Sequence, residues 1–273
     1  MRKAALFLAV LACGTLCAQN NQGEATGSVN AVFDKYQQPD VSLEVYFTPS
    51  KGKATPDEKG FIRRWSLLEP ISKPEIRSNS IFTDSYLKAE FAKEYFNDQM
   101  TVLPKDGDKV TVSIAKPTRQ MGRPGVPQGP QQGAPQAQPA QPEYQDVTLT
   151  WHCFDSKRYN VKLYRFATGL GLRPTECLFL AVTVINAPQD MTVRLAAGSN
   201  SASMWWVNGK EVLLLSGDRR MVVDDCVSGL ITLKKGKNIV RGAVINGPGM
   251  SDFCVRFLDE SGKPVTNLTV SNK

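Results

Sequence analysis

The stretch from Gly198 to Leu215 reads GSNSASMWWVNGKEVLLL and combines a tight turn with two adjacent tryptophans. Asn208-Gly209 lies between two apolar runs, which favours a type I′ β-hairpin because both central residues of that turn have positive φ. In the strand before the turn, successive side chains point to opposite faces of a sheet. We therefore predict that Trp206 enters the core and that Trp205 is exposed as a flat apolar platform.

On both sides of this hairpin, short apolar runs are separated by Asp, Asn, Gly and Pro. Those with strand character cover residues 41–47, 61–68, 109–114, 147–154, 161–166, 177–185, 191–196, 230–233, 239–245 and 253–258. Short strands at such spacing are typical of a β-sandwich. The sequence thus predicts an all-β fold over residues 41–270.

One segment has helical spacing. Leu87, Phe91 and Tyr95 recur every four residues as one apolar stripe, and Thr83 or Asp84 precedes them as a potential N-cap. We predict a helix between residues 83 and 96 that packs on a sheet. It is the one helix that the sequence predicts.

The N-terminal residues resemble an export signal. Arg2 and Lys3 precede an apolar run from Ala4 to Ala12, and small residues follow as far as residue 18. Because this run is too short to span a bilayer, we predict a cleavable signal over 1–18, a flexible lead-in over 19–40, and no membrane span. The protein is expected in the periplasm or outside the cell, and lipid anchoring through Cys13 is the less favoured alternative.

Residues 117–145 are rich in Pro, Gln, Gly and Ala and contain few large apolar side chains. Such a composition buries too little apolar surface to offset the entropy of ordering the backbone, so we predict a disordered loop. We favour an insertion within a single sandwich, because the preceding segment has few strands for a core of its own. A linker between two domains is the alternative.

Charge and cysteine content exclude some functional classes. The chain has 33 basic and 26 acidic residues, a formal net charge of +7, and its basic residues are scattered, so nucleic acid is not a predicted partner. Four cysteines follow the signal, and either disulfides or buried free thiols fit them: Cys153, Cys177, Cys226 and Cys254. No CxxC or histidine-rich spacing indicates a metal site.

Several segments resemble the galactose-binding-like β-sandwich modules, which are non-catalytic domains attached to secreted bacterial glycoside hydrolases and esterases. The resemblance covers about residues 60–265 and rests on the segments Phe61–Pro70, Leu149–Phe154, Trp206–Lys210, Leu233–Asn238 and Phe253–Phe257. Residues 198–225 and 246–259 are similar to the module that precedes the catalytic domain of acetylxylan esterases. The resemblance implies a jelly-roll sandwich that binds carbohydrate, although the Pro/Gln-rich loop departs from the pattern.

Catalytic signatures are sparse. The Gly-x-Ser-x-Gly nucleophile elbow is absent, and His152, the single histidine, lies in an apolar strand where a buried, hydrogen-bonded side chain is expected. A glycosidase needs two carboxylates, and these would come from Asp218, Asp224, Asp225 and Asp252. Such acids are more often turn caps or solvated charges, and a structural Ca²⁺ site is another use for them. We predict no catalytic residues and no required cofactor.

A carbohydrate site combines an aromatic ring that stacks on the sugar with polar groups that bond its hydroxyls. We predict Trp205 as the ring, with a polar rim at one end of the sandwich formed by Asn200, Ser201, Arg219, Arg220 and Asn246. The predicted function is a secreted, non-catalytic module that binds a polysaccharide or other glycan, or that docks to a glycan-processing enzyme. A carbohydrate esterase or other hydrolase, and a structural or surface interaction protein, are the alternatives.

Overall fold

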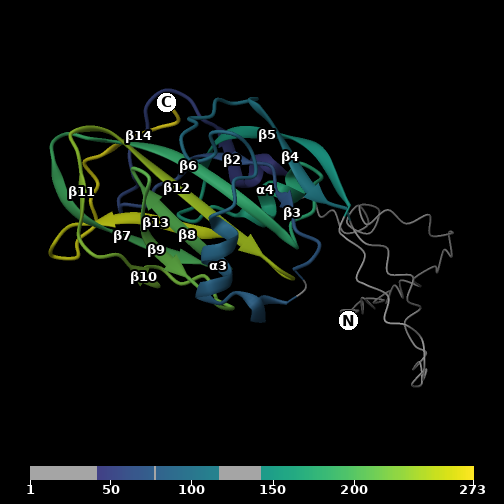
Figure 1. Cartoon of the computed structure of the whole chain (residues 1–273). Coiled ribbons are helices and arrows are strands. Elements are labelled where there is room, and N and C mark those ends of the chain that lie inside the picture. Colours follow the sequence, from purple (N-terminus) through teal and green to yellow (C-terminus); the bar gives the residue numbers. More distant parts are fainter. Residues whose placement is uncertain (1–41, 77, 117–142) are drawn as a thin grey trace, which may run out of the picture. The chain divides into compact units, whose positions relative to one another are not determined.

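The computed structural model describes residues 42–76, 78–116 and 143–273 (Figure 1). The predicted signal and lead-in, and residues 117–142 of the predicted loop, lie outside this part of the chain. The last residues of that predicted loop are strand instead, because β5 (Tyr144–Ser156) begins at Tyr144 and pairs there with Ala115.

Within the described ranges, ten strands form one antiparallel sheet, which we call the large sheet. Its main path runs in the order β1 (Phe47–Pro49), β5, β2 (Arg64–Leu68), β6 (Cys177–Ala187), β12 (Gly236–Asn246), β8 (Ala202–Val207) and β9 (Lys210–Leu215). Three short strands extend it: β3 (Ile71–Ser72) and β14 (Thr269–Ser271) pair with β6, and β4 (Lys109–Ala115) pairs with β5.

The other four strands form a second antiparallel sheet, the small sheet, around β7 (Met191–Ser199). Its partners are β10 (Cys226–Val227), β11 (Ile231–Leu233) and β13 (Phe253–Leu258). In Figure 1, β7 and β13 lie below the long strands β6 and β12 of the large sheet. One cluster of buried apolar side chains draws on both sheets. The predicted all-β sandwich is therefore confirmed.

The large sheet is buried on both faces. A second apolar cluster lies on its other face and includes Leu87 and Phe91 of α3 (Asp84–Phe91). The predicted helix is thus present but shorter than expected, and the side chain of Thr83 caps it by accepting a hydrogen bond from the backbone N–H of Tyr86 at 3.3 Å. Ten of the eleven residues of β6 are buried, which explains why the run CLFLAVTVINA does not alternate between apolar and polar residues.

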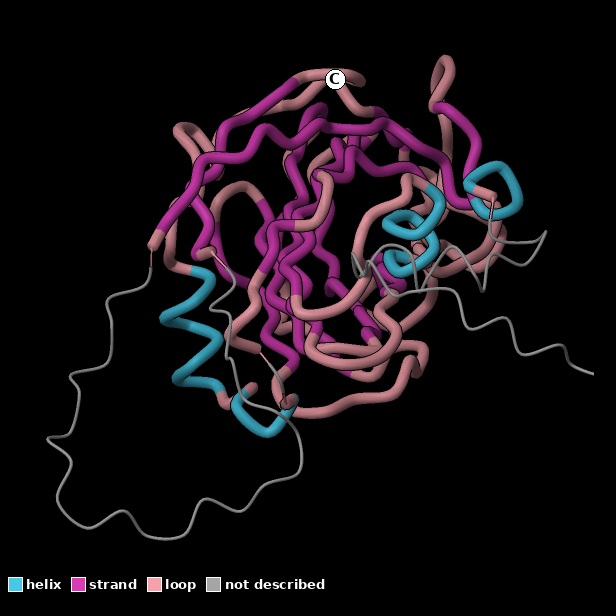
Figure 2. The backbone as a smooth tube through the Cα atoms, turned by 90° about the vertical axis from the view of Figure 1, so that its right-hand side faces the viewer, coloured by secondary structure: helices cyan, strands magenta, loops and turns pink. Residues whose placement is uncertain are grey.

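Two predicted strands are helical. Residues 43–46 form α2 (Leu43–Tyr46), and residues 163–169 form α4 (Leu163–Gly169). In α4 the buried residues are Leu163, Phe166 and Ala167, which are spaced as one face of a helix and not as the alternating positions of a strand. A further short turn, η2 (Asn79–Ile81), precedes α3. In Figure 2 the helices lie outside the stacked strands.

The hairpin forms as predicted, but Trp205 does not have the predicted exposure. Asn208 and Gly209 have φ of 51° and 77°, as a type I′ turn requires. Trp205 is fully buried between the sheets, where its ring lies 5.8 Å from that of Trp65 and 5.0 Å from that of Phe253. Trp206 points the other way and is half-buried against Phe91. The rings alternate as expected, but the small sheet covers the face on which Trp205 lies, whereas Trp206 lies on the face that α3 covers.

The cysteines of the described chain are free thiols, and Cys153, Cys177 and Cys254 are buried. Burial raises the pKa of the Cys177 and Cys254 thiols, which makes them unreactive small apolar side chains. The structure therefore agrees with the buried-thiol alternative and not with a disulfide framework.

Candidate functional site

Three of the predicted rim residues come together where β8 begins and β12 ends. The Ser201 hydroxyl donates to Oδ1 of Asn246 at 2.8 Å, and Nδ2 of Asn246 donates to the carbonyl oxygen of Pro174 at 2.8 Å. Asn200 donates through Nδ2 to the carbonyl oxygen of Met250 at 3.0 Å. Ser201 and Asn246 are buried. These side chains fix the surrounding loops, and the ring predicted beside them, Trp205, is in the core.

The remaining rim residues and the candidate carboxylates separate into local pairs. Arg219 binds Asp225 at 2.5 Å, whereas Arg220 is exposed. The other three acids have different partners: Asp218 accepts from Asn79, Asp224 binds Arg256, and Asp252 binds Lys162. No cluster of three or more His, Cys, Asp or Glu side chains suited to a metal ion occurs among the residues that the structure describes.

His152 is only partly buried. Its Nε2 lies 3.2 Å from Oε1 of Glu69, and its ring stacks on Phe154 with an interplanar angle of 4°. The predicted hydrogen-bonded side chain is present, and its polar partner is a carboxylate from the turn between β2 and β3.

A pocket of about 770 Å³ opens on the side of the small sheet that faces away from the core. We call it the outer-face pocket; its walls come from the 55–63 segment, Tyr159, Val223 and Arg256. Arg256 alternates on β13 with Val255 and Phe257, which are buried in the core, so its side chain points outward. Gly198 of β7 lets a neighbouring segment cross this face, because a Cβ atom there would lie 1.8 Å from the carbonyl oxygen of Val222.

The outer-face pocket has an accessible aromatic ring. Tyr159 is 42% exposed, and its ring lies 5.2 Å from that of the buried Phe61 at an angle of 51°. The guanidinium of Arg256 lies 4.9 Å from the centre of the Phe61 ring on which Tyr159 rests. The Phe61 ring therefore packs against one part of the Tyr159 ring, and the rest of the Tyr159 ring is exposed to solvent.

The charged groups of this pocket are held in place. Arg256 donates through Nε to Asp224 at 2.9 Å and through Nη1 to the carbonyl oxygen of Lys59 at 2.9 Å, and the bond to Asp224 raises the pKa of the guanidinium. Oδ1 of Asp57 accepts the backbone N–H groups of Lys59 at 3.0 Å and Phe61 at 2.9 Å, which folds the loop over the pocket. The side chains of Asp57 and Arg256, which line the same pocket as Tyr159, are thus held in a fixed arrangement.

Sequence inspection did not find this pocket, because its walls come from four separate parts of the chain. The available signal was Tyr159 itself, a large ring in a polar turn, Ser-Lys-Arg-Tyr-Asn, where nothing requires an apolar side chain.

A second polar cluster lies under α3. Glu90, whose side chain is 3% exposed, accepts from Lys73 at 2.6 Å, from Lys93 at 2.5 Å, and from the hydroxyl of Tyr95. Burial opposes the charge of Glu90, but these three donors lower the pKa of its carboxyl group. Burial also opposes the charge of Lys73, yet its bonds to Glu75 and Glu90 raise the pKa of its ammonium. Because the Glu90 carboxylate already has three donors, the cluster fastens α3 to the segment after β3.

This cluster predicts how stability depends on pH. Because folding lowers the pKa of Glu90, its contribution to the free energy of unfolding is complete above the ordinary pKa of 4.5. This contribution is lost as the pH falls through the pKa of the folded state. Because folding raises the pKa of Lys73, its contribution to the free energy of unfolding is complete below the ordinary lysine pKa of 10.5 and is lost at higher pH. The urea midpoint should therefore fall between about pH 5 and pH 3, and less so in Glu90→Gln. An equal fall in both proteins would contradict this assignment.

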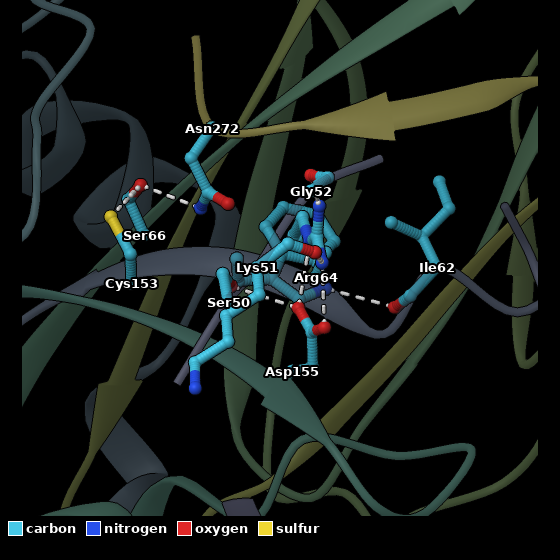
Figure 3. A network of polar contacts seen from close by, with 10 residues as sticks. Ser50, Lys51, Gly52, Ile62, Arg64, Ser66, Cys153, Asp155 and Asn272 are labelled. Atoms are coloured by element: carbon cyan, nitrogen blue, oxygen red, sulfur yellow. Dashed lines mark hydrogen bonds and ion pairs between the residues drawn. The ribbon is translucent and has the colours of Figure 1, made fainter. Parts of the chain in front are cut away.

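A third network joins the edge of the large sheet to the end of the chain (Figure 3). Arg64, only 4% exposed, bonds both oxygens of Asp155 at 2.7 Å and the carbonyl oxygens of Lys51 and Gly52. Beside it, Nδ2 of Asn272 donates to the Ser66 hydroxyl at 2.9 Å. The loop after β1 and the segment after β14 are thereby fixed to β2.

Comparison with known proteins yields weak likenesses. No family model and no curated protein matches the chain. A β-glucosidase from Kluyveromyces marxianus in complex with glucose is 17% identical, with 40% of this chain and 14% of that chain covered and a TM-score of 0.29. The PA14 domain of the MpAFP antifreeze protein is 9% identical over 81% of this chain and 96% of that domain, with a TM-score of 0.38. At these TM-scores, neither fold family nor function transfers to this chain.

No helix in the described ranges has the length and apolar character needed to cross a membrane.

Proposed function

We propose that the protein is an exported carbohydrate-binding module and that it holds its ligand in the outer-face pocket. The single observation that carries the proposal is the exposed ring of Tyr159 within a pocket of about 770 Å³. An aromatic face contacts the C–H groups of a sugar ring, and fixed polar groups nearby bond its hydroxyls. Tyr159 takes the role that the sequence had suggested for Trp205.

The polar groups of the pocket suit neutral hydroxyls, which both donate and accept hydrogen bonds. Asp57 offers carboxylate oxygens, while Lys59 and Arg63 offer donors, and all three line the same pocket as Tyr159. Because Asp57 and Arg256 are already held by the hydrogen bonds described above, little side-chain entropy is lost when a sugar binds. The proposal assigns no catalytic role to these residues, and turnover of a chromogenic acetate ester by the purified protein would contradict that part.

Affinity electrophoresis in gels that contain soluble plant or host polysaccharides, acetylated xylan among them, tests the proposal. Tyr159→Ala is expected to weaken retention of the protein by about tenfold or more, because it removes the stacking surface. Tyr144→Ala is the matched control, since Tyr144 is also an exposed tyrosine, at 61%, but does not line the outer-face pocket. Equal retention of the two variants, or no retention of the wild type on any polysaccharide, would contradict the proposal and favour a docking or structural role.

A further inference from the structure

A second pocket, of about 540 Å³, lies beside the network of Figure 3. We call it the basic pocket. Three separate segments form it: the loop at 50–53 after β1, the turn at 105–106 before β4, and residues 271–273 at the end of the chain. It shares no residue with the outer-face pocket.

The base of this pocket is rigid and electrically balanced. Arg64 forms an ion pair with Asp155, and its remaining donors bond the backbone of the 50–53 loop, so its charge is already satisfied. Ser66 bonds Asn272 on one side and lies 3.2 Å from the Cys153 sulfur on the other. Figure 3 shows these contacts converging from β2, β5 and the end of the chain. The segments that carry the pocket walls therefore have fixed backbones before any ligand binds.

The walls carry an excess of positive charge. Lys53, Lys105 and Lys273 all line the pocket, and none of their ammonium groups has an ion pair or hydrogen bond with any residue in the described part of the chain. The one side-chain carboxylate in the lining is that of Asp106, and its Oδ1 already accepts the backbone N–H of Cys153 at 2.8 Å. Three cations around one pocket repel each other, and an anion relieves that repulsion.

We infer that the basic pocket binds a divalent oxyanion, namely sulfate or phosphate, either free or as an ester group on a polymer. Three ammonium groups match the charge and the several acceptor oxygens of such a group. The hydroxyl groups of Ser50 and Ser271 line the same pocket and add neutral polar contacts. The basic pocket is separate from the proposed sugar pocket, so either proposal can be disproved without affecting the other.

Calorimetric titration of the full chain at constant ionic strength tests the inference, with sodium sulfate, sodium phosphate, dextran sulfate and unmodified dextran as probes. Saturable binding of at least one anion is expected, and any binding of unmodified dextran is expected to be unaffected by changes to the basic pocket. Stronger binding of dextran sulfate than of free sulfate identifies a polymer ester as the preferred source, and the reverse identifies the free ion.

Variants separate this pocket from general charge attraction. Lys53→Ser combined with Lys105→Ser is expected to weaken binding by about tenfold or more. The control is Lys235→Ser with Lys237→Ser, which removes the same charge from exposed residues near the start of β12 and should weaken binding less than about twofold. Equal effects of the two pairs, or heats that match those of sodium chloride at the same ionic strength, would overturn the inference.

Discussion

Gly242→Ala is expected to destabilise the protein by about 3 kcal/mol, the upper part of the range for overpacked cores. Gly242 lies on β12 directly opposite Trp205 on β8, and a Cβ atom there would lie 2.3 Å from Cζ3 of the indole. The indole has little room to move, because the rings of Trp65 and Phe253 enclose it. Urea unfolding, followed by circular dichroism, measures the change.

Two further variants check the cause of this loss. Gly229→Ala is the control, because no atom lies within 4 Å of its added Cβ and its φ is not positive, and its expected change is below about 0.5 kcal/mol. Trp205→Phe should lower the free energy of unfolding less in the Gly242→Ala variant than in the wild type, since the smaller ring leaves room for the methyl group that Gly242→Ala adds. If Gly242→Ala proved as stable as Gly229→Ala, the packing of Trp205 against β12 would be wrong.

Replacing Glu90 has the second large expected effect. Glu90→Gln should lower the free energy of unfolding by about 3 kcal/mol, because it removes the charge that compensates a buried cation. The side chain of Lys73 is 9% exposed and would keep only one ion-pair partner, Glu75, whose own side chain is half exposed. The hydroxyl of Tyr95 would also exchange a charged acceptor for a neutral one.

The matched control for Glu90 is Glu143→Gln. Glu143 also binds a lysine, Lys116, at 2.9 Å, but both side chains are exposed, so no measurable loss of stability is expected. Both variants are compared in urea at neutral pH. A loss in Glu90→Gln no larger than that in Glu143→Gln would show that the cluster under α3 does not hold the helix to the sheet.

Local chemistry allowed the sequence to predict several elements. The Asn208-Gly209 turn, the N-cap at Thr83 and the alternation of Trp205 with Trp206 all depend on neighbouring residues, and all three are present. What covers each ring depends on remote features, namely the small sheet over Trp205 and α3 over Trp206. Periodicity describes the faces of a strand but not what covers them.

The candidate sites were beyond sequence reasoning for the same reason. Tyr159 is 97 residues from Arg256 along the chain, and the two share a pocket because Val161 pairs with Phe253, and Phe61 with Arg256, across β-bridges. The predicted rim was found in part: Asn200, Ser201 and Asn246 lie together, but their polar groups are used to hold loops. The sequence thus located these loop residues at one end of the sandwich, but it did not show that their hydrogen-bonding groups are already used within the protein.

The central claim is that Tyr159 is the ring that contacts the ligand. Nuclear magnetic resonance of protein labelled with ¹³C at the rings of its seven tyrosines, titrated with an oligosaccharide from a polysaccharide that retains the protein, measures this most directly. The Tyr159 signals are predicted to shift in a saturable manner, while those of Tyr144 and Tyr95 stay in place. Saturable shifts at Tyr144 with none at Tyr159 would contradict the account.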